Sequence, residues 1–224
     1  MKIRMHRVTP PKKQKYIANF LDEEQINELL TVFEKEPMYT VVLLTAFYAL
    51  RRSEVLGLKW ESVDFNNNTV IIKDTVVEYD TVIEKERTKT KASYRTLPLA
   101  NDIRNYLQQL KLHQDENRML LGNAYIKNDY VCKWENGKTF NPNYITERFY
   151  HVIRKSNLPI IRFHDIRHSS ASLLLASGFS LKEIQEYLGH GDLATTANIY
   201  AHLLFESKKN MAASMQNKLK IQMR

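Results

Sequence analysis

The sequence has few features of a secreted or membrane protein. Its single cysteine, Cys132, excludes a disulfide within the chain and is typical of a reducing compartment. No apolar run reaches the roughly 18 residues that a membrane span needs. The first seven residues, MKIRMHR, lack the apolar segment of a signal peptide. We therefore expect a cytoplasmic protein without a membrane partner, in which Cys132 is a small strand residue.

Positive charge is the main compositional feature. The 224 residues carry a formal net charge of +8 and a pI near 9.4, and 43% hydrophobic residues are enough for one sizeable core. Clustered Lys and Arg gain free energy from counterion release on nucleic acid, which favours a polyanionic partner. Charge alone leaves two alternatives open, because an anionic membrane surface would serve as well and many basic proteins bind neither.

Helical periodicity covers most of the chain. Asp22 is a candidate N-cap with Gln25 at the reciprocal position, and the range 38–50 is apolar nearly all round, which is typical of a buried central helix. Gly178 and Gly189 are helix stop signals. The predicted helices are 22–36, 38–50, 53–59, one capped by Asn101 or Asp102 with Ile103, Tyr106, Leu107 and Leu110 inward, 143–156 capped by Asn143, 164–177, 180–187 capped by Ser180, and 192–200.

A region rich in β-branched residues interrupts the helices after a turn at Asn66–Asn68. Strands are predicted at 69–72, 75–79 and 94–99. The basic run 85–91 lies in or beside a connection, and 117–142 is expected to be irregular apart from a hairpin turn at Asn136–Gly137. The predicted fold class is α+β, a mostly helical domain with a small antiparallel β-sheet across about residues 69–99 on one side.

Side chains suited to breaking a phosphodiester occur in three separate stretches, 49–54, 164–168 and 190–202. The phosphate oxygens are negatively charged and the leaving alkoxide is a strong base. Catalysis without a metal therefore needs fixed cations, a nucleophile and an acid. Arginine, as at Arg51, binds two oxygens at once and stays charged. A tyrosine such as Tyr200 is only about 0.1% ionised at neutral pH, so cations must favour its phenolate.

Two of these stretches also have ordinary structural interpretations. Arg51 and Glu54 lie three apart at a helix start, where an exposed ion pair is worth less than about 1 kcal/mol. Tyr200 is one of twelve tyrosines, and a lone tyrosine on a helix usually serves packing. Neither stretch alone decides between the chemical and the structural interpretation.

The third stretch is equally open. His164 and Arg167 share a helix face. Apart from chemistry, both could be solvated helix residues, or the histidine could be buried and hydrogen-bonded. His164 and His168 have the spacing of a metal-binding pair, but position 165 is Asp where the zinc motif has Glu, and no third ligand is evident. We expect neither a metal nor another cofactor.

Taken together and in order, the segments resemble the catalytic domain of the tyrosine recombinase (phage integrase) family, in particular integrases of phages and conjugative transposons. The resemblance covers about residues 20–202, with 1–19 as a linker or basic arm and 203–224 as a C-terminal helix or tail. The matching segments are Leu50–Glu54 around Arg51, Thr88–Leu99, His164–His168, Leu188–His190 and Tyr200–His202.

The resemblance implies a role for each matching residue at the phosphate. Arg51, Arg167 and His190 would cradle the scissile phosphate, and Tyr200 would attack it to give a 3′-phosphotyrosyl bond. The family's separate core-binding domain has no counterpart, because the chain begins in what resembles the interdomain linker. We expect a fragment or a naturally short form.

Proton transfer would fall to two further residues. Lys89, or Lys91 on the same stretch, would protonate the departing 5′-hydroxyl, and His164 would assist proton transfer at Tyr200. The implied function is site-specific recombination that integrates or excises a mobile element. The implied partners are double-stranded DNA at attachment or core sites, further copies of the chain in a tetrameric synapse packed through the C-terminal tail, and an excisionase or host DNA-bending protein.

Three other functions would share some of these features. A type IB topoisomerase-like enzyme uses the same phosphotyrosyl chemistry as a monomer. A catalytically idle DNA-binding regulator would keep the scaffold without the reaction. A metal nuclease would cleave with a different set of ligands.

Overall fold

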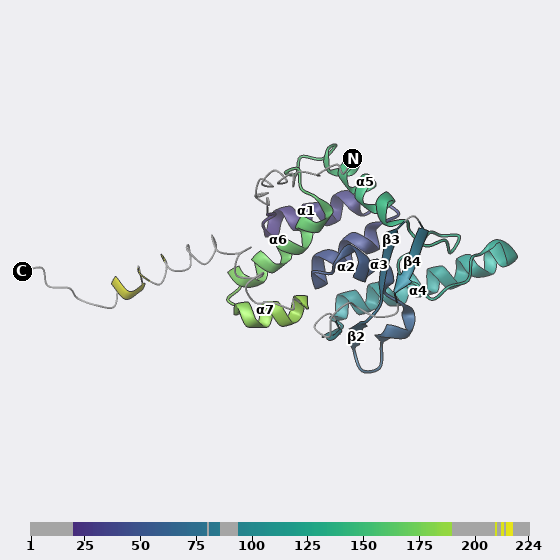
Figure 1. Cartoon of the computed structure of the whole chain (residues 1–224), viewed down its shortest axis with the longest axis horizontal. Helices are drawn as coiled ribbons and strands as arrows, with labels where there is room; N and C mark the ends of the chain where they lie inside the picture. Colours follow the sequence, from purple (N-terminus) through teal and green to yellow (C-terminus); the bar gives the residue numbers. More distant parts are fainter. Residues whose placement is uncertain are drawn as a thin grey trace, which may run out of the picture.

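The computed structural model describes residues 20–79, 81–85, 94–189, 209, 212 and 214–216. Within them the chain is α+β and mostly helical, as predicted (Figure 1). The predicted helix 192–200 and most of the tail lie outside the described residues. The elements are α1 (Glu23–Phe33), α2 (Tyr39–Tyr48), α3 (Arg52–Gly57), η1 (Trp60–Ser62), β1 (Val63–Asp64), β2 (Thr69–Ile72), β3 (Thr75–Tyr79), β4 (Thr81–Lys85), β5 (Arg95–Pro98), α4 (Asn101–Leu121), η3 (Gly122–Ala124), α5 (Pro142–Ile153), α6 (Phe163–Ala176) and α7 (Leu181–Leu188).

Helix α2 is the centre of the hydrophobic core, which confirms the predicted buried helix. It is apolar nearly all round and packs against α1, α3 and α6, which surround it in Figure 1. It ends at Ala49, whose φ of 50° is left-handed and turns the chain sharply. Arg51 follows two residues later, so the end of the most buried helix fixes the start of the candidate site.

Local capping was predicted correctly at two helices. The Asp22 Oδ1 accepts from the Gln25 N–H at 2.9 Å, and the Gln25 Oε1 accepts from the Asp22 N–H at 3.1 Å. At α7, Ser180 Oγ accepts from the Glu183 N–H at 3.3 Å, and Gly189 closes the helix with a left-handed φ of 67°. Helix α1 ends at Phe33 instead of residue 36, because the chain turns before Pro37.

Two predicted caps were wrong. The N-cap of α4 is Ala100, without a side-chain hydrogen bond, and this helix continues to Leu121, into the segment expected to be irregular. The N-cap of α5 is Asn141, not Asn143. Its Oδ1 accepts from the N–H groups of the next two non-proline residues at 2.7 and 3.3 Å. The reason is Pro142, which lacks an N–H and suits the first helical position.

Within the described residues the strands form two antiparallel sheets instead of one. Strand β2 pairs with β1 and β5 in a three-stranded sheet of order β1-β2-β5, whereas β3 pairs with β4 alone. The three predicted strands are confirmed as β2, β3 and β5. Strands β1 and β4 were missed, the first because two residues show no alternation. The basic run begins at the end of β4, and the rest of it lies outside the described residues.

Helix α3 lies unusually close to β3. A Cβ atom on Gly57 would stand 2.7 Å from the Asp74 carbonyl oxygen and 2.8 Å from the Thr75 Cα, so only glycine allows this approach. The close packing sets the position of α3, and with it that of Arg51 and Glu54.

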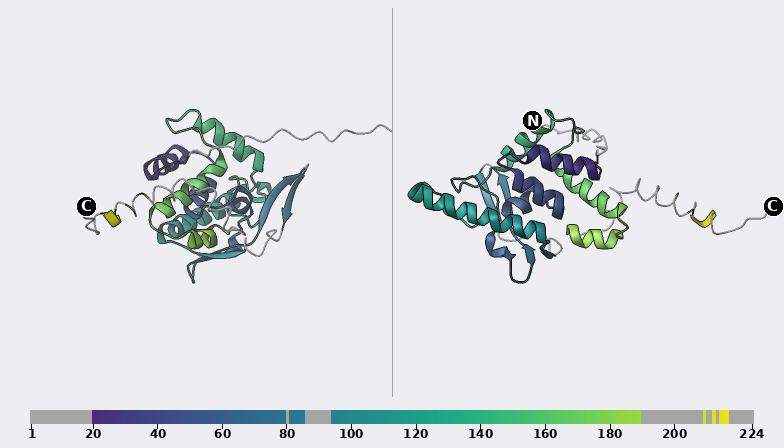
Figure 2. Two further views of the ribbon diagram at one scale, coloured as in Figure 1. Left: turned by 60° about the vertical axis from the view of Figure 1, so that its left-hand side comes forward. Right: turned by 180° about the vertical axis from the view of Figure 1, so that it is seen from behind.

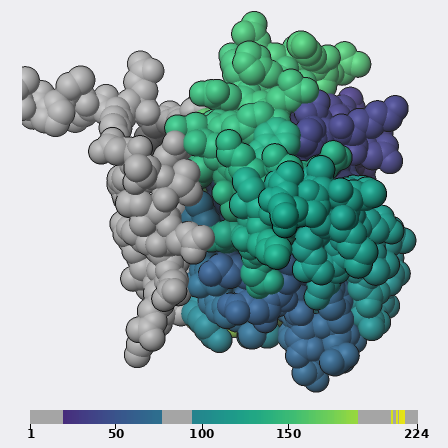
Figure 3. Space-filling model, turned by 90° about the vertical axis from the view of Figure 1, so that its right-hand side faces the viewer, coloured from purple at the N-terminus to yellow at the C-terminus, as the bar shows by residue number. Residues whose placement is uncertain are grey.

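The long helix α4 extends beyond the neighbouring elements in Figure 1 and in the right-hand view of Figure 2. With the connection after it, α4 covers much of the face in Figure 3. That connection contains the predicted hairpin turn, since the Gly137 N–H donates to the Trp134 carbonyl at 2.8 Å. Cys132 lies buried in a bend, not in a strand. Across the described ranges, no helix has both the length and the apolar character that crossing a membrane requires.

Candidate active site

Arg51 is the N-cap residue of α3, and Glu54 lies in the first turn of that helix. The Glu54 carboxylate accepts from the Arg51 N–H at 3.0 Å and from the Arg51 guanidinium at 2.5 Å. The Glu54 side chain is 1% exposed, whereas that of Arg51 is 33% exposed. The interpretation as a solvated surface ion pair is therefore wrong, because the carboxylate lies inside the protein.

Arg167 reaches the same carboxylate from α6. Its guanidinium is fully buried and lies 3.7 Å from Glu54 Oε2. The same guanidinium donates to the carbonyl of Ala49 at 2.5 Å and to that of Leu188 at 2.8 Å. The left-handed turn at Ala49 thus presents a carbonyl to Arg167. A solvated role for Arg167 is excluded, and Arg51 and Arg167, 116 positions apart in the sequence, meet at Glu54.

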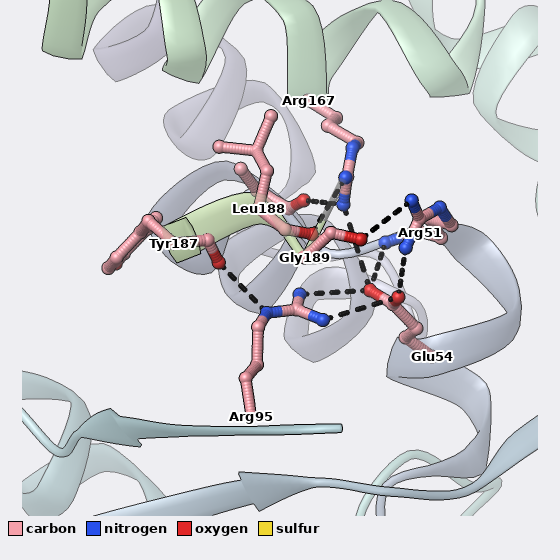
Figure 4. Close-up of polar contacts among 8 residues, drawn as sticks. Arg51, Glu54, Arg95, Arg167, Tyr187, Leu188 and Gly189 are labelled. Atoms are coloured by element: carbon pink, nitrogen blue, oxygen red, sulfur yellow. Dashed lines mark hydrogen bonds and ion pairs between the residues drawn. The ribbon is translucent and has the colours of Figure 1, made fainter. Parts of the chain in front are cut away.

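Arg95 is a third guanidinium at this carboxylate, and the sequence interpretation gave it no role. From β5 it donates to both Glu54 carboxylate oxygens at 3.3 and 3.0 Å, and its Nε donates to the Tyr187 carbonyl at 2.8 Å (Figure 4). One signal was available. Arg95 alternates with Thr96 and shares the buried face of its strand with Leu97, and a charged residue on a buried strand face needs a partner.

The cluster has an excess of positive charge. Three guanidinium groups surround one carboxylate, and the Arg51 guanidinium also donates to the Gly189 carbonyl at 3.2 Å (Figure 4). Burial alone would raise the pKa of the Glu54 carboxyl, but the charges of Arg95, Arg167 and Arg51 outweigh it, so the pKa is lowered. Glu54 thus stays ionised and offsets one of three positive charges. The remainder would attract an anion.

His164 lies one turn before Arg167 on α6. Desolvation on its inner side and the positive charge of Arg167 lower the pKa of its imidazole, and Arg51 contributes to the same effect. At neutral pH the ring is therefore mostly neutral and able to accept a proton. The neighbouring His168 ring lies edge-on at 4.8 Å between centroids. His168 is buried, and burial together with His164 lowers its pKa to about 4.

The other three predicted site residues, Lys89, His190 and Tyr200, lie outside the described residues. The described chain nevertheless leads to them. The carbonyl oxygen of Gly189, directly before His190, accepts a hydrogen bond from the Arg51 guanidinium. As for metals, the part of the chain that the structure describes contains no group of three His, Cys, Asp or Glu side chains placed to hold one.

Comparison with known sequences identifies the family of this chain. The profile of the phage integrase family matches residues 19–207. The chain belongs to the phage integrase family. Among curated relatives, this integrase-family chain is 27% identical over 221 residues to a tyrosine recombinase XerC-like protein of Caldanaerobacter subterraneus subsp. tengcongensis, covering 93% of this chain and 56% of that one. It is 29% identical to the ICEBs1 integrase of Bacillus subtilis, covering 81% of this chain and 48% of that one.

Solved structures of similar fold include an integrase and a recombinase. The Tn1549 transposon integrase, in complex with transposon right end DNA, matches with a TM-score of 0.72 at 20% identity, over 88% of this chain and 65% of that one. XerA recombinase matches with a TM-score of 0.65 at 22% identity, over 93% and 67%. The chain spans about half the length of the first two curated relatives. None of these relatives is named as a topoisomerase or a regulator.

Proposed function

We propose that this chain performs site-specific DNA recombination, as the catalytic part of an integrase that moves a mobile element. The observation that carries the proposal is the meeting of Arg51 and Arg167 at one buried carboxylate, beside a histidine of lowered pKa. Family membership supports the same reaction. The catalytic domain is proposed to span residues 20–202, between a basic arm and a C-terminal tail.

The first chemical step is attack of the Tyr200 phenol oxygen on the scissile phosphorus. A 3′-phosphotyrosyl bond forms and the bond to the 5′-oxygen breaks. Arg51, Arg167 and His190 bind the non-bridging oxygens, whose charge grows in the transition state. Neutral His164 accepts the phenol proton.

The second half of the reaction restores the DNA backbone. In the cleavage step, Lys89, or Lys91 beside it, has already donated a proton to the departing 5′-oxygen. A 5′-hydroxyl from a partner strand then attacks the phosphotyrosyl phosphorus and gives its proton to that lysine. The tyrosine oxygen leaves and recovers its proton from His164. The phosphotyrosine retains the energy of the broken bond, so no step requires a nucleotide cofactor.

The proposed partners are double-stranded DNA at attachment or core sites and further copies of this chain. Joining two duplexes requires four strand cleavages, which is why we propose a tetrameric synapse. The tail 203–224 would pack on a neighbouring copy, and an excisionase or host DNA-bending protein would set the direction. Removing residues 204–224 should then abolish synapsis on native gels, and unchanged synapsis would exclude the tail contact.

Covalent trapping tests the proposal. The protein is incubated with labelled duplexes enriched from random sequence, each nicked beside the cleaved position so that the freed 5′-end diffuses away and the adduct accumulates. We expect a covalent adduct on denaturing gels, a modified peptide containing Tyr200, and DNA binding without adduct for Tyr200→Phe. An adduct that persists in Tyr200→Phe would move the nucleophile elsewhere, and strand cleavage that is lost on chelation of metals would favour a nuclease.

A further inference from the structure

Arg95 uses more of its donors on the cluster than a salt bridge requires. Both Nη atoms donate to Glu54, and Nε donates to the carbonyl of Tyr187. Its side chain is 7% exposed, so these contacts replace water. The planar fork of arginine meets two carboxylate oxygens in parallel, which the single ammonium group of lysine cannot do. The site therefore depends on the shape of Arg95 as well as on its charge.

The three contacts connect elements that the proposed reaction must align. Glu54 lies in the first turn of α3 and holds Arg51. Tyr187 lies in the last turn of α7, two residues before Gly189 and three before His190. Arg95 itself follows the stretch containing Lys89 and Lys91 by only a few residues. One buried side chain therefore joins β5, which follows the lysine stretch in the sequence, to the first turn of α3 and to the end of α7.

We propose that Arg95 is a positioning residue for DNA cleavage, which orients Glu54 so that Arg51 and Arg167 face one phosphate and holds the end of α7 against them. The inference rests on the proposed recombination function. Arg95 acts through Glu54 and the α7 carbonyl and has no contact with the substrate. Of the three guanidinium groups, that of Arg95 contributes the largest lowering of the Glu54 pKa.

Three variants test this role in the full chain. Arg95→Gln removes the charge, and Arg95→Lys keeps the charge without the fork. The matched control is Arg148→Gln, because Arg148 also forms a bidentate pair, with Glu36 at 2.8 and 2.7 Å, and joins α5 to the turn after α1. Each variant is measured for DNA affinity, for thermal unfolding, and for the single-turnover rate of adduct formation at saturating DNA. The same nicked duplexes serve as probe.

We expect Arg95→Gln to lower the rate of adduct formation about 100-fold, since small misplacement of catalytic groups has effects of this size. The Kd for DNA should stay unchanged. The rate of adduct formation by Arg95→Lys should lie between those of Arg95→Gln and the wild type, about tenfold below the wild type. Arg148→Gln should cleave at the wild-type rate even if its melting temperature falls. Should Arg95→Gln fail to fold, the charged Arg95→Lys variant decides by the same comparison.

The pH profile separates positioning from simple stabilisation. The charged groups that face Glu54 are the guanidinium groups of Arg51 before α3, Arg95 on β5 and Arg167 on α6. Helix α7 contributes a backbone carbonyl, which accepts from Arg95. Without Arg95 the largest lowering of the Glu54 pKa is lost, so the carboxyl of Arg95→Gln takes up a proton at a higher pH than that of the wild type. The rate of Arg95→Gln should therefore fall more steeply than that of the wild type as the pH is lowered from neutrality.

Three results would overturn the inference. Arg95→Gln could cleave as fast as the wild type. The rate of Arg95→Gln could also fall by the same factor at every pH, with Arg95→Lys equally slow. That result would indicate a structural role alone. Finally, a wild-type chain that forms no adduct with any duplex would refute the proposed function and this inference together, so the two failures are distinguishable.

Discussion

Two turns of this protein are alike in local structure and differ in their long-range contacts. In both, an arginine precedes a helix and an acid follows three residues later, as Arg51 with Glu54 at α3 and Arg162 with Asp165 at α6. In both, the buried carboxylate accepts from the arginine N–H, at 3.0 and 2.8 Å. Each carboxylate also accepts from the guanidinium of its own arginine.

The difference lies in what arrives from elsewhere in the chain. Glu54 also receives Arg95 from β5 and Arg167 from α6, whereas the guanidinium at Asp165 is that of Arg162, which is 54% exposed. The same local motif thus starts a helix in one place and gathers three guanidinium groups around one carboxylate in the other. Spacing within a segment identifies the turn, and only the convergence of distant segments identifies the site.

The largest expected effect is on folding. Glu54→Gln leaves Arg51, Arg95 and Arg167 without their common counter-charge, and breaking a buried ion pair from one side costs about 3–5 kcal/mol. Asp165→Asn keeps an oxygen that accepts from the Arg162 N–H, and the Arg162 guanidinium that loses its partner is half-exposed to water. The unfolding free energy should therefore fall by only about 1–2 kcal/mol. Urea unfolding of both variants measures the two losses. Equal losses would remove the distinction between the two turns.

The next effect is on cleavage. Arg167→Ala removes one of the proposed phosphate ligands and should slow adduct formation by about 100- to 1,000-fold, or about 3–4 kcal/mol of barrier. Arg162→Ala, from the other turn, should stay close to the wild-type rate. Single-turnover assays on the nicked duplexes measure both. A strong defect in Arg162→Ala would mean that the α6 turn also belongs to the site.

A pH effect comes from His168, which shares α6 with Asp165 and faces His164, Asp165 and Arg167. Its pKa is about 4 when folded and 6.5 in the reference state. The unfolded chain therefore binds a proton between these values that the folded chain does not, and stability falls as the pH drops.

This one group should lower the unfolding free energy by about 2 kcal/mol from pH 7 to pH 5. His168→Leu should flatten the pH dependence by that amount in urea unfolding at the two pH values. An unchanged slope would show that His168 titrates alike in the folded and the unfolded chain.

The smallest effect concerns a turn with a purely local role. Ser180 and Glu183 cap α7 at the end away from the cluster. Ser180→Ala should lower stability by about 1 kcal/mol, the usual cost of losing an N-cap. Adduct formation should not change, since the carbonyls that Arg95, Arg167 and Arg51 contact lie at the other end of α7. A cleavage defect without further loss of stability would extend the site along the helix.

Much of the fold followed from local patterns. The apolar range 38–50, the caps at Asp22 and Ser180 and the glycine after α7 all act through neighbouring residues, so the sequence contains their signals. The caps of α4 and α5 were misplaced by one or two residues, because Ala, Asn and Asp stand together before α4 and an asparagine stands on each side of Pro142 at α5. Strand β4 is polar and lacks a clear alternation.

The sequence indicated those candidate residues that lie in local motifs, but not the contacts between distant segments. Family motifs indicated Arg51, His164 and Arg167, and two of these meet at Glu54. No local pattern indicated that Arg95 would reach Glu54, because that contact joins residues 41 positions apart. The buried state of Glu54 likewise depends on β5 and α6, which no spacing within its own turn reveals.

A double-mutant cycle tests the central claim most directly, that Arg51 and Arg167 bind one phosphate. The rate of adduct formation is measured for Arg51→Ala, Arg167→Ala and the double variant. Residues that act as a unit are strongly non-additive, so the double variant should lose about as much as the more damaging single one. If the two losses instead multiply, the arginines act on separate groups, and the common anion site is contradicted.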